Sequence, residues 1–106
     1  MVFIETPVFT KLVKELLLDE EYRKLQEALL LRPESGALIP NGGGLRKIRW
    51  GISGRGKRGG VRVIYYWDTP DDTIYMLTVY KKSAQENLTP SQLKLLRRLV
   101  EEWLNE

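Results

Sequence analysis

Hydrophobic side chains recur at helical spacing in three segments of the chain. The first segment begins at Thr6-Pro7, where a threonine cap followed by proline predicts a helix. The second begins at Asp19, which we expect to be its N-cap, and Pro33 stops it. The third begins at Thr89, because the sequence T-P-S-Q is a capping box. The apolar positions are Val8, Phe9, Leu12, Val13, Leu16 and Leu17; Tyr22, Leu25, Ala28, Leu29 and Leu31; and Leu93, Leu96, Leu99, Val100, Trp103 and Leu104.

Short runs rich in β-branched and aromatic residues predict the strands. They cover residues 2–5, 45–52, 61–67 and 73–81. The segment 35–44, which contains Gly, Pro and Asn, is interpreted as a packed loop. The order βααβββα predicts an α+β fold, in which a small antiparallel sheet is flanked by an N-terminal helical hairpin and a C-terminal helix. We expect residues 1–106 to form a single domain.

Composition excludes several kinds of chemistry. The chain has no cysteine and no histidine, which excludes disulfides, zinc fingers, thiol nucleophiles and the commonest general acid or base. No apolar run approaches the length of a membrane span, and the N-terminus lacks the basic and apolar regions of a signal peptide. We therefore expect a cytoplasmic protein without a membrane partner.

The net charge of +3 hides two regions of opposite sign. Residues 35–67 contain seven basic residues and no acidic ones. The rest of the chain holds ten basic and fourteen acidic residues, so its net charge is −4. The basic segment is interleaved with Ile, Val, Tyr and Trp, which is untypical of a disordered tail. It predicts an ordered basic surface that binds a polyanion.

Strand alternation indicates which polar residues could converge. Lys47 and Arg49 share one face of their strand, and Arg62 shares a face with Ile64 and Tyr66. On the next strand the corresponding set is Thr78, Tyr80 and Lys82. If these faces coincide they form a basic and aromatic concavity, although alternation does not set the register. Four apolar side chains would then point at the helices: Ile48, Trp50, Leu77 and Val79.

The glycine-rich segment of the basic region matches two nucleotide-binding patterns. Gly54-x-Gly56-x-x-Gly59 fits a dinucleotide fingerprint, and Gly51 to Lys57 fits most of a P-loop. Both motifs need a helix after the glycines, whereas here a strand follows. We interpret the segment as a hairpin connection whose backbone can approach a phosphate chain.

Three strings of the sequence resemble one toxin family. They are G-G-L-R-K-I-R-W from Gly43, G-K-R-G-G-V-R-V-I-Y-Y from Gly56, and Y-M-L-T-V-Y-K-K from Tyr75. Together with the helical hairpin, the P-x-x-G turn from Pro33 and the last helix, they resemble the HigB branch of the RelE toxins of bacterial toxin–antitoxin modules. The resemblance implies a RelE/ParE-like fold and an mRNA interferase, which cleaves messenger RNA on the ribosome and so inhibits translation. It also implies a cognate antitoxin, which we expect to be a small helix-turn-helix protein like HigA.

The resemblance also implies site residues. The catalytic candidates are Lys47, Arg49, Arg62, Tyr80 and Lys82. The candidates for binding RNA or the ribosome are Arg46, Arg55, Lys57, Arg58 and Lys81. Some relatives carry a catalytic tyrosine shortly after the last strand, where this chain has Ser83 to Leu88 and no tyrosine. We expect no metal and no cofactor.

The chemistry of RNA cleavage is compatible with these residue types. Attack of a 2′-hydroxyl on the adjacent phosphate needs a proton acceptor, cations near the phosphorane and a proton donor for the leaving oxygen. Without histidine, Lys, Arg and Tyr must supply these groups, and crowding cations together favours a neutral lysine. The division between base and acid stays open.

Alternative interpretations remain at this stage. A ParE-like toxin that inhibits DNA gyrase, or a non-enzymatic RNA-binding module, would fit the same pattern. Tyr65, Tyr66 and Trp67 are better explained by packing than by stacking on bases. If a carboxylate such as Glu5 or Asp68 pairs with Arg62, a role of Arg62 in binding phosphate is weakened.

Overall fold

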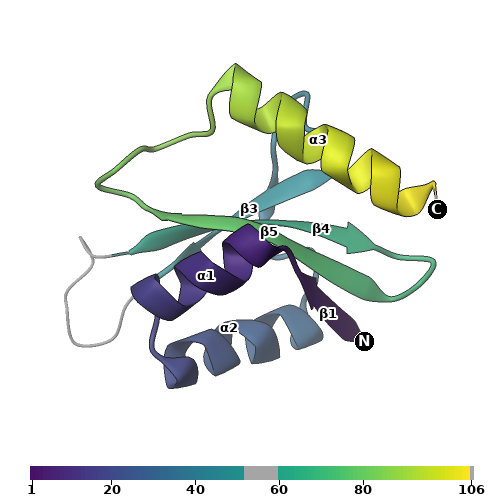
Figure 1. Cartoon of the computed structure of the whole chain (residues 1–106). Helices are drawn as coiled ribbons and strands as arrows, with labels where there is room; N and C mark the ends of the chain where they lie inside the picture. The colour runs from purple at the N-terminus through teal and green to yellow at the C-terminus, as the bar shows by residue number, and fades with distance from the viewer. Residues whose placement is uncertain (52–59, 106) are drawn as a thin grey trace.

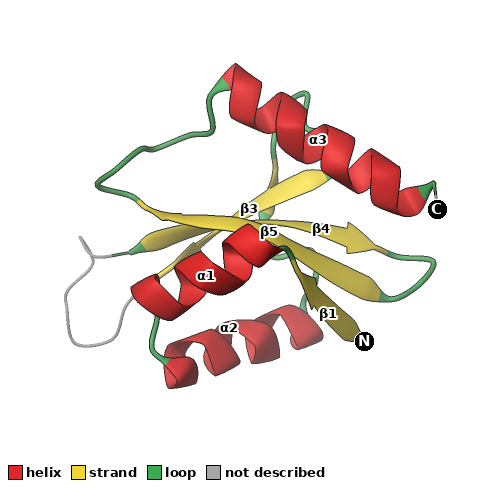
Figure 2. Cartoon of the chain, in the orientation of Figure 1, coloured by secondary structure: helices red, strands yellow, loops and turns green. Residues whose placement is uncertain are grey.

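Five strands and three helices form in the part of the chain that the structure describes (Figures 1 and 2). The computed structural model describes residues 1–51 and 60–105. The helices are α1 (Pro7–Leu16), α2 (Asp19–Leu31) and α3 (Pro90–Leu104). The strands are β1 (Val2–Glu5), β2 (Ala37–Leu38), β3 (Leu45–Trp50), β4 (Val61–Asp68) and β5 (Thr73–Lys81). The predicted α+β class is confirmed, with one strand more than expected.

The strands lie in the order β1-β5-β4-β3-β2, which places β4 in the middle of the sheet. The expected antiparallel meander of β3, β4 and β5 is confirmed. β1 instead pairs with β5 in parallel, from Val2 opposite Thr73 to Glu5 opposite Met76. The expectation of a loop over residues 35–44 is wrong in part, because Ala37 and Leu38 pair with Lys47 and Arg46 as a short edge strand. Two residues are too few for alternation to reveal a strand.

The helix termini follow from local hydrogen bonds. Thr6 and Thr89 cap α1 and α3 as predicted, and each side chain accepts from the backbone amide three residues on. Asp19 is not the N-cap of α2, because the helix begins one residue earlier than expected. Leu18 is the N-cap, and its amide donates to the Glu21 carboxylate at 2.8 Å. In the described part of the chain, none of the helices is long and apolar enough to cross a membrane.

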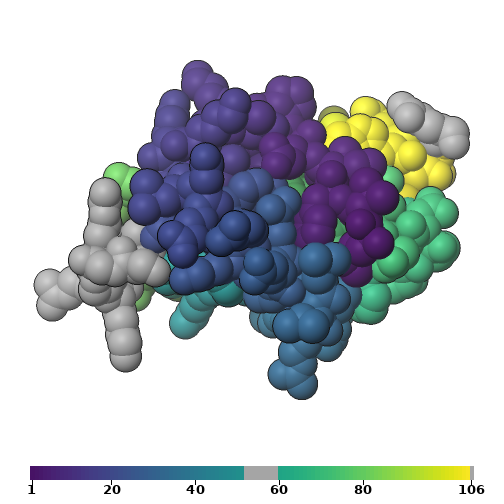
Figure 3. All heavy atoms as spheres, turned by 90° about the horizontal axis from the view of Figure 1, so that it is seen from below, coloured from purple at the N-terminus to yellow at the C-terminus, as the bar shows by residue number. Residues whose placement is uncertain are grey.

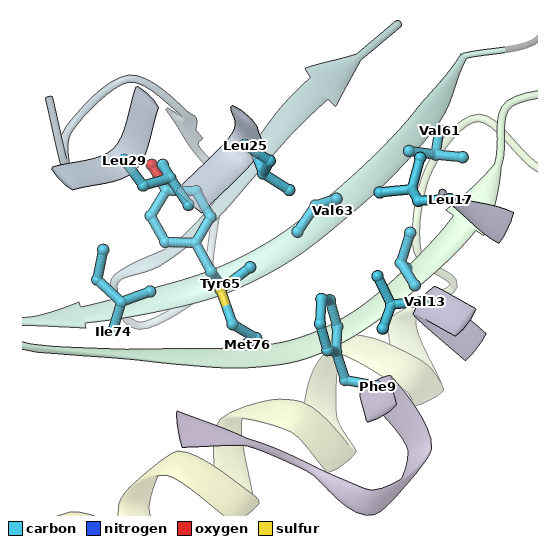
Figure 4. Close-up of a cluster of buried hydrophobic side chains, with 11 residues drawn as sticks. Phe9, Val13, Leu17, Leu25, Leu29, Val61, Val63, Tyr65, Ile74 and Met76 are labelled. Atoms are coloured by element: carbon cyan, nitrogen blue, oxygen red, sulfur yellow. The ribbon is translucent and has the colours of Figure 1, made fainter. Parts of the chain in front are cut away.

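The two faces of the sheet bury separate cores. Residues of α1 and α2 pack on one face, around Phe9, Leu25 and Tyr65 (Figure 4), and the first third of the chain covers that side of the molecule (Figure 3). α3 packs on the other face, where Ile64, Leu77 and Val100 are buried. Three predicted core positions are wrong, because Val8 is 57%, Leu31 84% and Leu104 43% exposed.

A bulge in β5 changes the predicted alternation. Ile64 pairs with Thr78 but Tyr65 pairs with Met76, so Leu77 is the extra residue. As a result Leu77 packs on the α3 side while Val79 packs on the side of α1 and α2. The expectation that both point at the same helices is therefore wrong.

Tyr65 connects β4 to the turn after α2. Its hydroxyl donates to the carbonyl of Pro33 at 2.7 Å and accepts from the amide of Gly36 at 2.8 Å. A Cβ atom on Gly36 would lie only 2.7 Å from the Tyr65 ring, so glycine permits this close approach. Burial is the main cause of a raised pKa of Tyr65. The packing role expected for Tyr65 agrees with this environment.

Replacing Tyr65 with phenylalanine removes both hydrogen bonds and leaves the part-buried Pro33 carbonyl and the buried Gly36 amide without this partner. We expect Tyr65→Phe to lower the free energy of unfolding by about 1–3 kcal/mol, measured by urea denaturation. Tyr66→Phe is the control, since among the described residues the Tyr66 hydroxyl has no hydrogen-bond partner, and it should change stability by less than about 0.5 kcal/mol. Equal effects of the two substitutions would contradict this explanation.

Candidate functional site

Three neighbouring strands bring the predicted polar residues to the α3 face of the sheet. Arg49 lies opposite Arg62, and Arg62 lies opposite Tyr80, so the three form one row across β3, β4 and β5. Lys47 lies in the next row, opposite Ile64. The register thus superposes the polar faces as the alternation of the strands suggested.

Arg62 is the most buried member of this cluster. Its side chain is 4% exposed, and Nη2 lies 3.4 Å from Oε1 of Glu86. Nε is buried and has no hydrogen-bond partner in the described part of the chain. A buried guanidinium with an unused donor costs free energy unless an anion approaches it. Among the described residues, the hydrogen-bonding capacity of this guanidinium is therefore only partly satisfied.

Glu86 is the acceptor around which the cluster gathers. The same Oε1 lies 3.7 Å from Arg49 Nη2, and the Tyr80 hydroxyl donates to the Glu86 carbonyl at 3.4 Å. Desolvation alone would raise the pKa of the Glu86 carboxyl. The hydrogen bond from Arg62 and the charges of Arg62, Arg49 and Lys82 outweigh desolvation and hold that pKa below its ordinary value of 4.5. Lys82 thus belongs to the same electrostatic cluster.

Lys47 is bound by the same loop. Its Nζ donates to Oδ1 of Asn87 at 2.7 Å. Residues 82–88, which connect β5 to α3 (Figure 1), therefore place Glu86 and Asn87 against the cluster. The sequence analysis missed both residues. One signal was present: Glu86 is the single acidic residue between Asp72 and Glu101.

Tyr80 is half-buried beside Arg62. Desolvation raises the pKa of its hydroxyl above 10.0, Arg62 lowers it and Glu86 raises it again, and the net shift is upward. Tyr80 therefore keeps its proton at neutral pH. This state suits a hydrogen-bond or proton donor and does not suit a general base.

The other predicted residues lie elsewhere. Arg46 donates from Nη1 to the carbonyls of Glu34 and Gly36, at 3.2 and 2.8 Å, so it fastens the turn before β2. Lys81 is exposed at the end of β5, opposite Val61, and outside the row of Arg62. Arg55, Lys57 and Arg58, and most of the two glycine patterns, fall within residues 52–59, outside the described residues.

Glu5 and Asp68, the two carboxylates considered as partners of Arg62, lie elsewhere in the fold. Glu5 accepts hydrogen bonds from Thr10 Oγ1 at 2.6 Å and from the Tyr22 hydroxyl at 2.5 Å. Asp68 lies at the far end of β4, opposite Thr73. The anion beside Arg62 is Glu86, whose side chain is 47% exposed. Because it sits on a loop and meets water, it is easier to displace than a buried partner would be.

Residues 1–51 and 60–105 contain no group of three or more Asp, Glu, His or Cys side chains that could hold a metal ion. The described cluster is instead dominated by cations. Such a cluster can bind an anion, neutralise charge that develops on it and donate protons to it.

Comparison with known protein families relates this chain to a toxin family. The sequence profile for the RelE toxin of the RelE/RelB toxin–antitoxin system matches residues 2–106. The match includes all helices and strands, together with the cluster around Arg62.

The ion cluster should be visible in the titration of Glu86. We expect the Glu86 carboxyl to titrate below 4.5 and its pKa to rise in Arg49→Gln, measured by carbon-detected NMR. Because the folded-state pKa is lowered, the cluster stabilises the fold above pH 4.5, and this contribution is lost as the pH falls through the folded-state pKa.

The matched control for this titration is Arg46→Gln, which removes a guanidinium bound to backbone carbonyls instead of to Glu86. It should leave the Glu86 titration unchanged. A Glu86 pKa that does not respond to Arg49→Gln would show that the contact with Arg49 is not maintained in solution.

Proposed function

The chain belongs to the RelE family of toxins of type II toxin–antitoxin systems, and on this premise we propose that it is a ribosome-dependent endonuclease that cleaves messenger RNA. The observation that carries the proposal is Arg62, a buried guanidinium whose Nε has no hydrogen-bond partner among the described residues. Arg49, Lys47 and Lys82 add charge around it. A phosphodiester in the chain of an RNA would supply the oxygen ligands that this site lacks.

The proposed reaction is an internal phosphoryl transfer. The 2′-oxygen of a ribose bonds to the adjacent phosphorus while the bond from phosphorus to the 5′-oxygen of the next nucleotide breaks. The products are a 2′,3′-cyclic phosphate and a 5′-hydroxyl. Arg62 and Arg49 would bind the non-bridging oxygens, which gain negative charge in the phosphorane. We propose that no metal ion takes part, because the cationic cluster itself stabilises this charge.

Proton transfer can be divided between two residues. Because Tyr80 keeps its proton at neutral pH, we assign it to donate a proton to the leaving 5′-oxygen. Lys47 would then take the proton of the 2′-hydroxyl, a step that requires its amine in the neutral form. Lys47 is held in place by Asn87, and it lies on the same face of the sheet as Arg62, one row away.

Glu86 occupies the position in which the phosphate would bind. Its carboxylate contacts both Arg62 and Arg49 in the free chain. RNA must therefore displace it, and the exposed loop position makes this possible. The carboxylate offsets the repulsion among the cations until the substrate arrives.

The family implies a RelB-family antitoxin as the partner. We further propose that the chain belongs to the HigB branch, because of the G-K-R-G-G-V-R-V-I-Y-Y run that begins at Gly56. The antitoxin would then be a small helix-turn-helix protein like HigA. A toxin that acts on translating ribosomes works in the cytoplasm.

Loss of Arg62 or Lys47 should abolish toxicity. We expect Arg62→Ala and Lys47→Ala to lower the cleavage rate by about a hundredfold or more, since each removes a group that acts on the transition state. Growth arrest on induced expression should disappear. The measurement is mapping of new 5′ ends on a translated transcript, with circular dichroism to verify folding.

Arg23→Ala is the control, because Arg23 is exposed on α2 and pairs with Glu27. It should remain fully toxic. Arg62→Lys keeps the positive charge but lacks the planar guanidinium. It therefore tests whether the guanidinium itself is needed while a cation remains at the site. Full toxicity of Lys47→Ala, or DNA damage without cleavage of messenger RNA, would contradict the proposal, and the second result would indicate a toxin that acts on gyrase.

A further inference from the structure

A groove with a volume of about 620 Å³ lies beside the Arg62 cluster. It runs between the turn at residues 39–41 and the N-terminal half of α3, and we call it the α3 groove. The side chains that matter for the argument are Ile39, Lys47, Asn87, Leu93, Lys94 and Arg97. In Figure 1 the loop that precedes β3 lies on the same side of the sheet as α3.

The α3 groove is continuous with the cluster. Lys47 and Asn87, joined by their 2.7 Å hydrogen bond, line both the groove and a second hollow of about 580 Å³. Arg49 lines this second hollow. A single-stranded nucleic acid that contacts Arg49 can therefore pass over Lys47 and enter the α3 groove.

The groove presents cations over an apolar floor. Lys94 and Arg97 lie three residues apart on α3, on one side of the helix, and neither forms an ion pair within the described part of the chain. No acidic residue occurs from 87 to 100. A Cβ atom on Gly43 would lie 3.2 Å from Arg97 Nε, so the absence of a side chain at Gly43 leaves space for Arg97 beside the turn.

This combination fits one class of ligand. Ile39 and Leu93 offer apolar surface to a base, while Lys94 and Arg97 can bind the phosphates on either side of it. We propose that the α3 groove binds the nucleotide next to the cleaved phosphate in single-stranded RNA. The inference rests on the proposed nuclease function and extends it to residues that the sequence analysis did not select.

Binding of an uncleavable RNA tests the groove separately from catalysis. The probe is a fluorescent single-stranded oligonucleotide in which every 2′-hydroxyl is methylated, so that it cannot react. Lys94→Gln/Arg97→Gln should raise Kd about tenfold at 100 mM salt and reduce the slope of log Kd against log salt by about 1.4, the loss of two phosphate contacts. The same double variant should raise KM for cleavage and leave kcat within about twofold.

The matched control is Lys14→Gln/Arg98→Gln, which removes two exposed cations outside the groove from α1 and α3. It should change Kd by less than about twofold. Equal losses in the two double variants, or no binding by the unmodified protein at 50 mM salt, would overturn the inference.

Two further measurements separate other ligands of the same residues. A loss of affinity only for vacant ribosomes would assign Lys94 and Arg97 to ribosomal RNA, and a loss only for the antitoxin would assign them to an acidic protein. Either result overturns the inference. If the groove variants weaken binding of the oligonucleotide but the unmodified protein does not cut translated messenger RNA, the nuclease proposal fails and the groove remains an RNA site.

Discussion

Strand β4 constrains the whole structure, because it lies in the middle of the sheet with both faces covered. Val63 and Tyr65 complete the core under α1 and α2, and Ile64 completes the core under α3. Because successive side chains of a strand point to opposite faces of the sheet, each residue of β4 contributes to one of the two cores. Arg62 is the exception, since its position in the same strand forces a permanent charge into a nearly buried place.

The site follows from this constraint. A guanidinium removed from water needs an anion, and the fold supplies one from the loop after β5. Because Glu86 is partly exposed and contacts Arg49 as well, it offsets part of the positive charge and leaves the cluster accessible to solvent. A buried carboxylate would hold Arg62 more firmly and would leave no place for an incoming phosphate. Glu86 satisfies Arg62 only in part, because Nε has no hydrogen-bond partner in residues 1–51 and 60–105.

The loop after β5 links the cluster around Arg62 to the α3 groove. Asn87 follows Glu86 in the chain and holds Lys47, and the two residues Lys47 and Asn87 also form the near end of the α3 groove. α3 thus has two roles in the proposed function. Its inner side, centred on Val100, covers the second core, while Lys94 and Arg97 lie along the groove.

Local sequence determined the N-caps of α1 and α3, the three long strands and the basic character of one face, because these depend on residues adjacent in the chain. Asp19 shows the limit of local rules: three acidic residues suit the first turn of α2, and only the hydrogen bond from Leu18 to Glu21 shows where it begins. Tertiary structure alone decided the parallel pairing of β1, the bulge at Leu77, and Glu86 as the anion beside Arg62. These features depend on contacts between residues far apart in the chain, which alternation and capping patterns do not encode.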